Sequence, residues 1–198
     1  MEKKIKVAFQ GEKGAYSHIA SLEVFPNADV KACATFEDTF RLAKENSEYK
    51  IVIPIENSLV GRVADIHYLI PKYKLQIHAE HFQKVTHNLL GVKGSKIENI
   101  KTVRSHSHAI GQCQKIIDKN KLKPIIAADT AGSAKYIAQN NDKSESAIAS
   151  DLAAKIYDLQ ILKSNIEDEA GNVTRFLIMG RDSNHPELKE KKYITSCI

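Results

Sequence analysis

The chain has 198 residues, of which 42% are hydrophobic and 27% are charged, and this balance excludes a predominantly disordered protein. Charged residues interrupt the longest apolar runs, so none of them reaches the ~20 residues that a membrane-spanning helix needs. The net charge of +5 comes from dispersed lysines, and a nucleic-acid-binding surface is therefore not expected.

The first third of the chain alternates between strand and helix patterns. Residues 4–10 predict a strand and residues 15–25 a helix, and after a second strand at residues 30–34, Thr35 predicts the cap of a second helix because an acidic residue follows three positions later. Residues 51–55 predict a fully buried strand. This alternation is typical of an α/β layer with parallel strands.

The pattern changes near residue 75, where residues 75–80 and 85–92 predict long extended segments that cross between two lobes. Three further strands are expected, at residues 102–104, 125–128 and 147–149, each followed by a helix. The helix after Ser105 is predicted to run unbroken through Ile117. The chain then reaches a last buried strand at residues 176–179, preceded by turn residues Gly171-Asn172.

Thr174 and Arg175 lie side by side where this last strand begins. An arginine can hold a carboxylate with two hydrogen bonds, and a threonine hydroxyl can donate to the same bound molecule. The ordinary alternative is that Thr174 is a β-former and Arg175 an exposed edge charge.

Four predicted strand ends pass directly into a small polar residue suited to cap a helix, namely Glu56-Asn57-Ser58, Ser105-His106, Asp129-Thr130 and Ser150-Asp151. Helix N-termini at the carboxyl edge of a sheet provide N–H groups and partial positive charge for anions. These junctions favour a cleft for a small anionic molecule, although such caps are also routine in α/β proteins.

Several other kinds of site do not fit the residue spacing. Residues 11–17 match neither a phosphate-binding loop nor a dinucleotide fingerprint, and a turn with Ser17 facing the cleft is the better interpretation. No nucleophile elbow is present. No metal site is expected, because the histidines lack a helix-borne pair or a partnering cysteine pair; they are His78, His81, His87, His106 and His108.

Processing and redox state also follow from simple patterns. The N-terminus leads straight into a strand without the apolar stretch and cleavage site of a secretory signal, which predicts a cytoplasmic protein. Cys33, Cys113 and Cys197 are scattered, which predicts reduced, structural thiols.

Six sequence blocks, in order, closely resemble the prephenate dehydratase family. They are FQGEKGAYSHIA (9–20), PIENSLVGRVADIHYLI (54–70), VRSHSHAIGQC (103–113), ADTAGSAKYIA (128–138), AIASDLAAKIYDLQIL (147–162) and NIEDEAGNVTRFLIMG (165–180). The resemblance implies two α/β lobes with an interlobe cleft, similar to type II periplasmic binding proteins with two crossovers. It implies lobe 1 at residues 1–80 and 172–182 and lobe 2 at 81–171.

The resemblance also implies an activity and the residues that carry it. The reaction would be decarboxylating dehydration of prephenate to phenylpyruvate in phenylalanine biosynthesis, without a cofactor, since formation of an aromatic ring drives it. Thr174 would protonate the leaving hydroxyl and Arg175 would hold a carboxylate, with Glu56 and Asn57 as the other catalytic positions. Substrate-binding positions would be Ser17, Ser58, Ser105, Gln112, Asp129, Thr130 and Phe176.

Some features depart from the family pattern. The chain has Ser105-His106-Ser107-His108 where Ser-His-Pro-Gln is common, and Ala15 where threonine is common. Residues 183–198 resemble the start of an ACT regulatory domain, so the chain is either a short form or a truncated one, and inhibition by phenylalanine through such a domain is not expected. The sequence leaves open whether the protein forms a homodimer, whether it also accepts arogenate, and whether Glu56 and Asp129 are protonated or orient donors. A non-catalytic module that binds small anions on the same fold is the alternative function.

Overall fold

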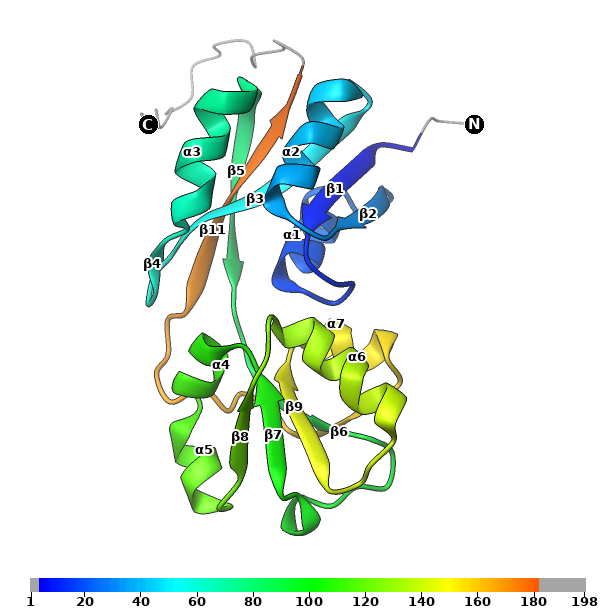
Figure 1. Cartoon of the computed structure of the whole chain (residues 1–198), viewed down its shortest axis with the longest axis vertical. Coiled ribbons are helices and arrows are strands. Elements are labelled where there is room, and N and C mark those ends of the chain that lie inside the picture. Colours follow the sequence, from blue (N-terminus) through cyan, green and yellow to red (C-terminus); the bar gives the residue numbers. More distant parts are fainter. Residues whose placement is uncertain (1–3, 182–198) are drawn as a thin grey trace.

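Two α/β lobes, each built on its own sheet, are stacked along the long axis of the computed structural model, which describes residues 4–181 (Figure 1). The predicted fold class is confirmed, since each lobe has strands covered by helices. No helix within residues 4–181 has both the length and the apolar character needed to cross a bilayer. The predicted ACT-like segment at residues 183–198, and with it Cys197, falls outside the described residues.

The upper lobe in Figure 1 contains the N-terminal part of the chain and one returning strand. Its elements are β1 (Lys6–Gln10), α1 (Tyr16–Val24), β2 (Asp29–Cys33), α2 (Phe36–Glu45), β3 (Tyr49–Asn57), β4 (Gly61–Arg62), α3 (Ala64–Tyr73), β5 (Gln76–Lys84) and β11 (Val173–Gly180). The strand order is β2-β1-β3-β11-β5, with β4 paired to β3. As predicted, β1, β2 and β3 are parallel, whereas β11 is antiparallel to both of its neighbours.

Side chains on the two faces of this sheet enter different cores. Ile51, Ile53 and Met179 pack with Phe40 of α2 and Ile66 of α3. Alternate strand positions, among them Val52, Phe176 and Ile178, pack with Ala20 of α1. Strand residues point to opposite faces in turn, so neighbouring residues of β11 belong to different sides of the lobe.

The lower lobe contains the middle of the chain. Its elements are β6 (Asn88–Gly91), the 3₁₀ turn η1 (Ile97–Asn99), β7 (Thr102–Ser105), α4 (Ser107–Gly111), α5 (Gln114–Lys119), β8 (Lys123–Ile126), α6 (Thr130–Asn140), β9 (Glu145–Ala149), α7 (Asp151–Ile156) and β10 (Gln160–Lys163). The strand order is β10-β6-β9-β7-β8. Strands β9, β7 and β8 are parallel, as the strand and helix alternation predicts.

The single helix predicted after Ser105 is wrong, because the chain forms two short helices there, α4 and α5. Asp168 explains the break. Its backbone N–H donates to the carbonyl of Gln112 at 2.7 Å, and its carboxylate accepts from the backbone N–H of Lys115 at 3.1 Å. Both backbone groups, which a continuous helix would satisfy internally, therefore have a partner outside the helices.

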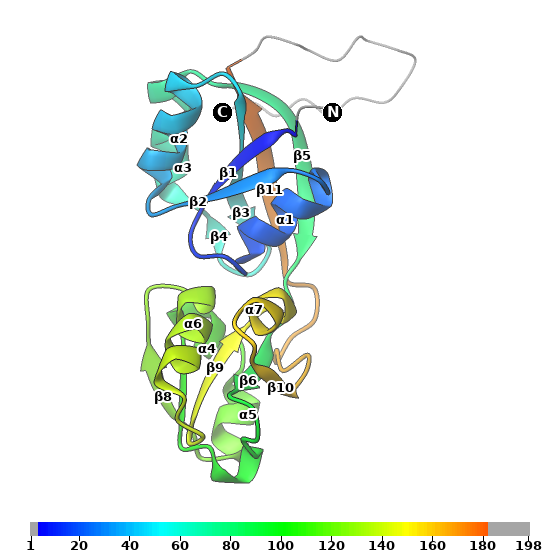
Figure 2. The same cartoon turned by 90° about the vertical axis from the view of Figure 1, so that its right-hand side faces the viewer.

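Two extended connections join the lobes, one from β5 to β6 and one from β10 to β11 (Figure 2). They lie side by side, since the N–H of Val85 in the first donates to the carbonyl of Asn172 in the second at 2.9 Å. The predicted lobe boundary after residue 80 falls inside β5, whose pairing with β11 continues to Lys84.

A third contact between the lobes comes from the loop between β1 and α1. The Ser150 hydroxyl donates to the carbonyl of Gly14 at 2.6 Å, and the Tyr157 hydroxyl donates to the carbonyl of Lys13 at 2.8 Å. Lys135 of α6 forms an ion pair with Glu12 at 3.1 Å. The loop is thus attached to α6 and α7 of the opposite lobe.

Candidate active site

A cleft of about 450 Å³ lies where the two lobes meet, and both lobes line it. Lobe 1 contributes side chains from α1, β3, β4 and β11, and lobe 2 contributes side chains from α4 and the start of α6. A larger surface hollow of about 670 Å³ lies beside residues 24–28. It brings together none of the predicted site residues, so the cleft between the lobes is the candidate site.

The structure brings many of the predicted site residues to this cleft, although they are far apart in the sequence. Those that line it are Ser17, Asn57, Gln112, Asp129, Thr130, Thr174 and Phe176. Four predicted residues do not line it, namely Glu56, Ser58, Ser105 and Arg175.

Arg175 is the main correction to the sequence-based prediction. Thr174 and Phe176 line the cleft, whereas Arg175 projects from the opposite face of β11, because successive strand residues alternate. There it forms ion pairs with Glu80 at 2.7 Å and Glu56 at 3.2 Å. Burial lowers the pKa of Arg175, but the hydrogen bonds that Arg175 donates to these two carboxylates, together with their negative charges, outweigh that effect and raise the pKa. Arg175 thus has two carboxylate partners from lobe 1 and lies outside the cleft lining that includes Thr174.

A β-bulge explains why Asn57, and not Glu56, faces the cleft. Arg175 is opposite Glu56, but the next residue, Phe176, is opposite Pro54, so Ile55 is an extra residue in β3. Ile55 packs in the core beneath α2 and α3, while Pro54 and Asn57 both line the cleft. Because the extra residue shifts the alternation by one position, Asn57 faces the same side as Thr174.

Asn57 donates a hydrogen bond from Nδ2 to the Thr174 hydroxyl oxygen at 2.9 Å. The orientation of this amide is fixed, because its Oδ1 accepts from the backbone N–H groups of Leu59 and Val60 at 3.0 and 3.1 Å. The Thr174 oxygen thus already accepts a hydrogen bond, and the hydroxyl proton is left to donate elsewhere.

Further side chains extend this contact across the lobe junction. Asn57 Nδ2 also donates to Asn172 Oδ1 at 2.7 Å, and Asn172 Nδ2 donates to Gln112 Oε1 at 2.8 Å. Gln112 Oε1 lies 2.9 Å from Nε2 of His87. Burial lowers the pKa of His87, although the hydrogen bond with Gln112 raises it in part. Residues from both lobes therefore share one network that ends at Thr174.

The other predicted residues outside the cleft have identifiable partners. The hydroxyl of Ser58 donates to the carbonyl of Gly171 at 2.8 Å and accepts from the N–H of Val173 at 3.0 Å, which ties the start of β11 to β3. Ser105 is fully buried and donates to the carbonyl of Ile148 at 2.7 Å. Neither hydroxyl is directed at the cleft, because backbone groups hold both.

Only two of the four predicted helix caps are confirmed. Asp129 and Ser150 accept from backbone N–H groups in the first turns of α6 and α7. Glu56 and Asn57 remain within β3, however, and the helix that follows begins at Ala64 without a side-chain cap. The cap of α4 is His106, since Ser105 still belongs to β7.

The lobe 2 side of the cleft combines the N-terminus of α6 with two histidines. Asp129 and Thr130 at the start of this eleven-residue helix line the cleft together with His106 and His108. Burial lowers the pKa of His106; His108 lowers it further, and Asp129 partly opposes both effects. A neutral His106 whose Nδ1 accepts the N–H of His108 presents an N–H donor on its other ring nitrogen.

Sequence reasoning missed Arg62, and it did not assign His87 or Asn172 to the cleft. All three line it. Arg62 is exposed, and no carboxylate within the described part of the chain forms an ion pair with it. The spacing could have indicated Asn172, which lies two residues before Thr174 and so faces the same side.

Comparisons with known proteins show the family to which this chain is similar. A family model described as prephenate dehydratase matches residues 7–184. The chain is 40% identical over 197 residues to arogenate dehydratase/prephenate dehydratase 1 of Arabidopsis thaliana, covering 100% of this chain and 50% of that protein. It is also 40% identical over 175 residues to a bifunctional N-acyl-homoserine lactone acylase/prephenate dehydratase of Komagataeibacter europaeus, covering 88% of this chain and 62% of that protein.

A solved structure gives the same result for the fold. The prephenate dehydratase of Arthrobacter aurescens in complex with L-Phe is 26% identical and superposes with a TM-score of 0.86, over 93% of this chain and 63% of that one. The chain spans about half the length of several curated relatives that it matches.

Proposed function

Because the chain belongs to the prephenate dehydratase family, we propose that it converts prephenate to phenylpyruvate, with Thr174 as the general acid. The observation that carries the proposal is the 2.9 Å hydrogen bond from Asn57 Nδ2 to the Thr174 oxygen. The bond engages an acceptor site of that oxygen, so the threonine proton can be donated to a bound molecule.

The reaction needs few protein groups. Cleavage of the bond between the ring and its carboxylate releases carbon dioxide, and the electron pair enters the ring as the C–O bond to the leaving hydroxyl breaks. Thr174 donates its proton to that hydroxyl, which leaves as water, and regains a proton from solvent. General acid assistance of this kind typically contributes ~10² to 10⁴ in rate. The positioned amide of Asn57 also stabilises negative charge that develops on the threonine oxygen.

Prephenate carries two carboxylates, and we propose that Arg62 holds one of them in place of Arg175. Its position in the cleft lining and its freedom from any ion pair in the described residues support this role. The N-terminus of α6 and the His106 N–H are donors for the other carboxylate. One oxygen of the Asp129 carboxylate accepts the N–H of Gly132 at the start of α6, so the carboxylate is held against the helix N-terminus.

The decisive experiment mixes purified protein with prephenate at neutral pH and follows phenylpyruvate. Formation no faster than the uncatalysed rate would end the proposal. Thr174→Val separates a lyase from a module that only binds anions, since the lyase should lose turnover while still binding prephenate. A variant that loses neither would favour the binding module.

The same assay with arogenate tests the substrate, because relatives from Petunia hybrida are named arogenate dehydratases. Arogenate carries an amino group where prephenate carries a keto group. We take prephenate as the substrate, and faster turnover of arogenate would reverse that choice. The predicted cytoplasmic location and the homodimer that the sequence leaves open are part of the proposal, and cell fractionation and analytical ultracentrifugation test them.

A further inference from the structure

The network that ends at Thr174 has a single direction of hydrogen bonding, and this direction can be followed atom by atom. Its fixed point is Asn57, because two backbone N–H groups donate to its Oδ1. Asn57 therefore offers only donors to Asn172, which must present its Oδ1. Asn172 Nδ2 is then the donor to Gln112, which must present its Oε1.

The direction determines which ring nitrogen of His87 carries the proton. Gln112 Oε1 has no proton, so Nε2 of His87 must donate across the 2.9 Å contact. His87 is only 3% exposed, and burial lowers its pKa, which favours the neutral ring. In a neutral ring protonated at Nε2, the other nitrogen is an acceptor. That Nδ1 is buried and has no hydrogen-bond partner within residues 4–181.

Asn172 is the link on which this direction depends. It is 3% exposed and lies in the second connection between the lobes, where its carbonyl accepts from Val85 of the first connection. Asn57 and Thr174 belong to lobe 1, whereas Gln112 belongs to lobe 2. The Asn172 amide accepts a hydrogen bond from Asn57 of lobe 1 through Oδ1 and donates one to Gln112 of lobe 2 through Nδ2.

We propose that Asn172 is a positioning residue that passes the fixed orientation of the Asn57 amide to Gln112 and so holds His87 in the Nε2–H tautomer. Asn172 acts through its neighbours and takes no part in proton transfer. The tautomer of His87 does not depend on the proposed dehydratase function.

The substitution Asn172→Asp tests this directly. An ionised carboxylate still accepts from Asn57 but cannot donate to Gln112, so the Gln112 amide turns over and presents its NH₂ group to both neighbours. His87 Nε2 must then accept, and its proton moves to Nδ1. We expect ¹⁵N NMR of the histidine rings, at about pH 8 where an ordinary Asp is ionised, to report the Nε2–H tautomer in the native protein and the Nδ1–H tautomer in Asn172→Asp. The His87 signals are assigned by their loss in His87→Asn.

Two further variants make the test specific. Gln112→Glu keeps an acceptor toward both Asn172 and His87, so the Nε2–H tautomer should persist there although a negative charge has been added. Asn99→Asp adds the same charge at an exposed site in η1, and both the tautomer and the turnover should match the native protein.

A native Nδ1–H tautomer, or an unchanged Nε2–H tautomer in folded Asn172→Asp, would overturn the inference whatever the activity. If Asn172→Asp does not fold, the native tautomer and Gln112→Glu still decide. A native protein that forms no phenylpyruvate would instead overturn the proposed function and leave the tautomer result standing.

Discussion

Gly14→Ala is expected to weaken the contact between the lobes more than the loss of a glycine alone explains. Gly14 has φ of +93°, and a Cβ there would lie 2.7 Å from Cα and 2.9 Å from Cβ of Ala153 in α7. Left-handed backbone costs a residue other than glycine ~1–2 kcal/mol. The overlap with backbone atoms also forces the loop away from lobe 2 and breaks its hydrogen bonds with Ser150 and Tyr157, at 2.6 and 2.8 Å. Each such bond contributes ~0.5–1.5 kcal/mol.

The free energy of unfolding should therefore fall by about 2–5 kcal/mol, adding the backbone cost to two lost hydrogen bonds. Gly94→Ala is the matched control, because Gly94 also has positive φ, +79°, but its nearest neighbour is the mobile end of Lys143 at 3.4 Å. The control should lose only the backbone part, ~1–2 kcal/mol.

The measurement is urea unfolding followed by far-UV circular dichroism and by tyrosine fluorescence, since the chain has no tryptophan. Coincident transitions are needed before the free energies are compared. Equal losses of unfolding free energy in Gly14→Ala and Gly94→Ala would refute the idea that the close approach of Gly14 to Ala153 is needed for the contact between the lobes. Turnover should fall together with the free energy of unfolding in Gly14→Ala, because Ala15 and Ser17 beside this loop line the cleft.

Four other substitutions test single features of the site and the fold. Asn57→Asp keeps the backbone contacts of Oδ1 but draws the Thr174 proton to the new carboxylate, so kcat should fall at least about tenfold; native turnover would contradict the role of this amide. Arg62→Gln should raise KM for prephenate roughly tenfold or more, since a hydrogen bond to a charged group contributes ~1.5–3 kcal/mol. Arg175→Gln should lower the free energy of unfolding and leave KM nearly unchanged. If instead Arg175→Gln raised KM and Arg62→Gln did not, Arg175 would be the residue that binds the carboxylate. Burial and, to a lesser degree, the charge of Lys13 lower the pKa of His18 below its ordinary 6.5. The unfolded chain therefore binds a proton first, and the free energy of unfolding should fall as pH falls from 6.5 toward the lowered pKa. This loss should be smaller in His18→Asn, and equal slopes of the urea midpoint against pH in the two proteins would contradict the prediction.

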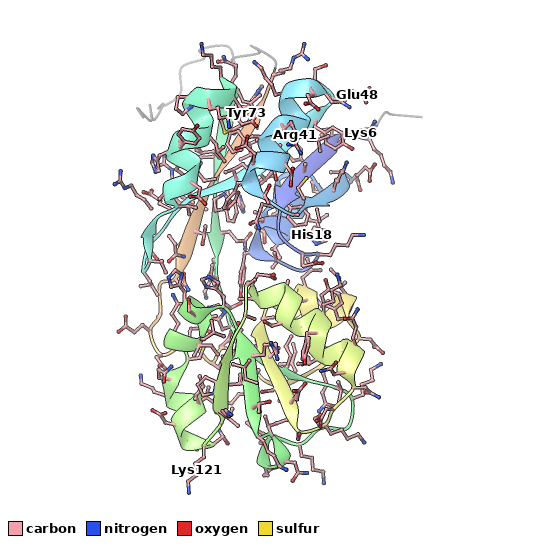
Figure 3. All side chains as sticks on the ribbon, in the orientation of Figure 1. Lys6, His18, Arg41, Glu48, Tyr73 and Lys121 are labelled. Carbon is pink, nitrogen blue, oxygen red and sulfur yellow. The ribbon has the colours of Figure 1, made fainter. Side chains whose placement is uncertain are left out.

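The position of His18 makes that last effect relevant to the lobe junction. It lies at the end of the upper lobe that faces the lower one (Figure 3). Its Nδ1 accepts the N–H of Gly14 at 3.0 Å, and its ring stacks on Phe9 at 5.1 Å. A proton on Nδ1 would remove the acceptor for Gly14, so acidification should loosen the same loop that Gly14→Ala disturbs.

Local patterns determined the fold class and the order of the elements. Hydrophobic periodicity identified most strands and helices because it reflects which face of an element is buried. The caps at Asp129 and Ser150 were predictable, since a cap bonds within its own first turn. The ordered sequence blocks identified the family and directed attention to Thr174.

Tertiary structure alone decided which neighbours of Thr174 share its cleft. Asn57 and Thr174 are 117 residues apart in the sequence, and the extra residue Ile55 in β3 turns Asn57 toward the cleft and Glu56 away from it. Adjacent residues on a strand face opposite sides, so Arg175 does not line the cleft although it follows Thr174 in the sequence. A sequence records which residues follow one another, but the register between distant strands determines which side chains meet.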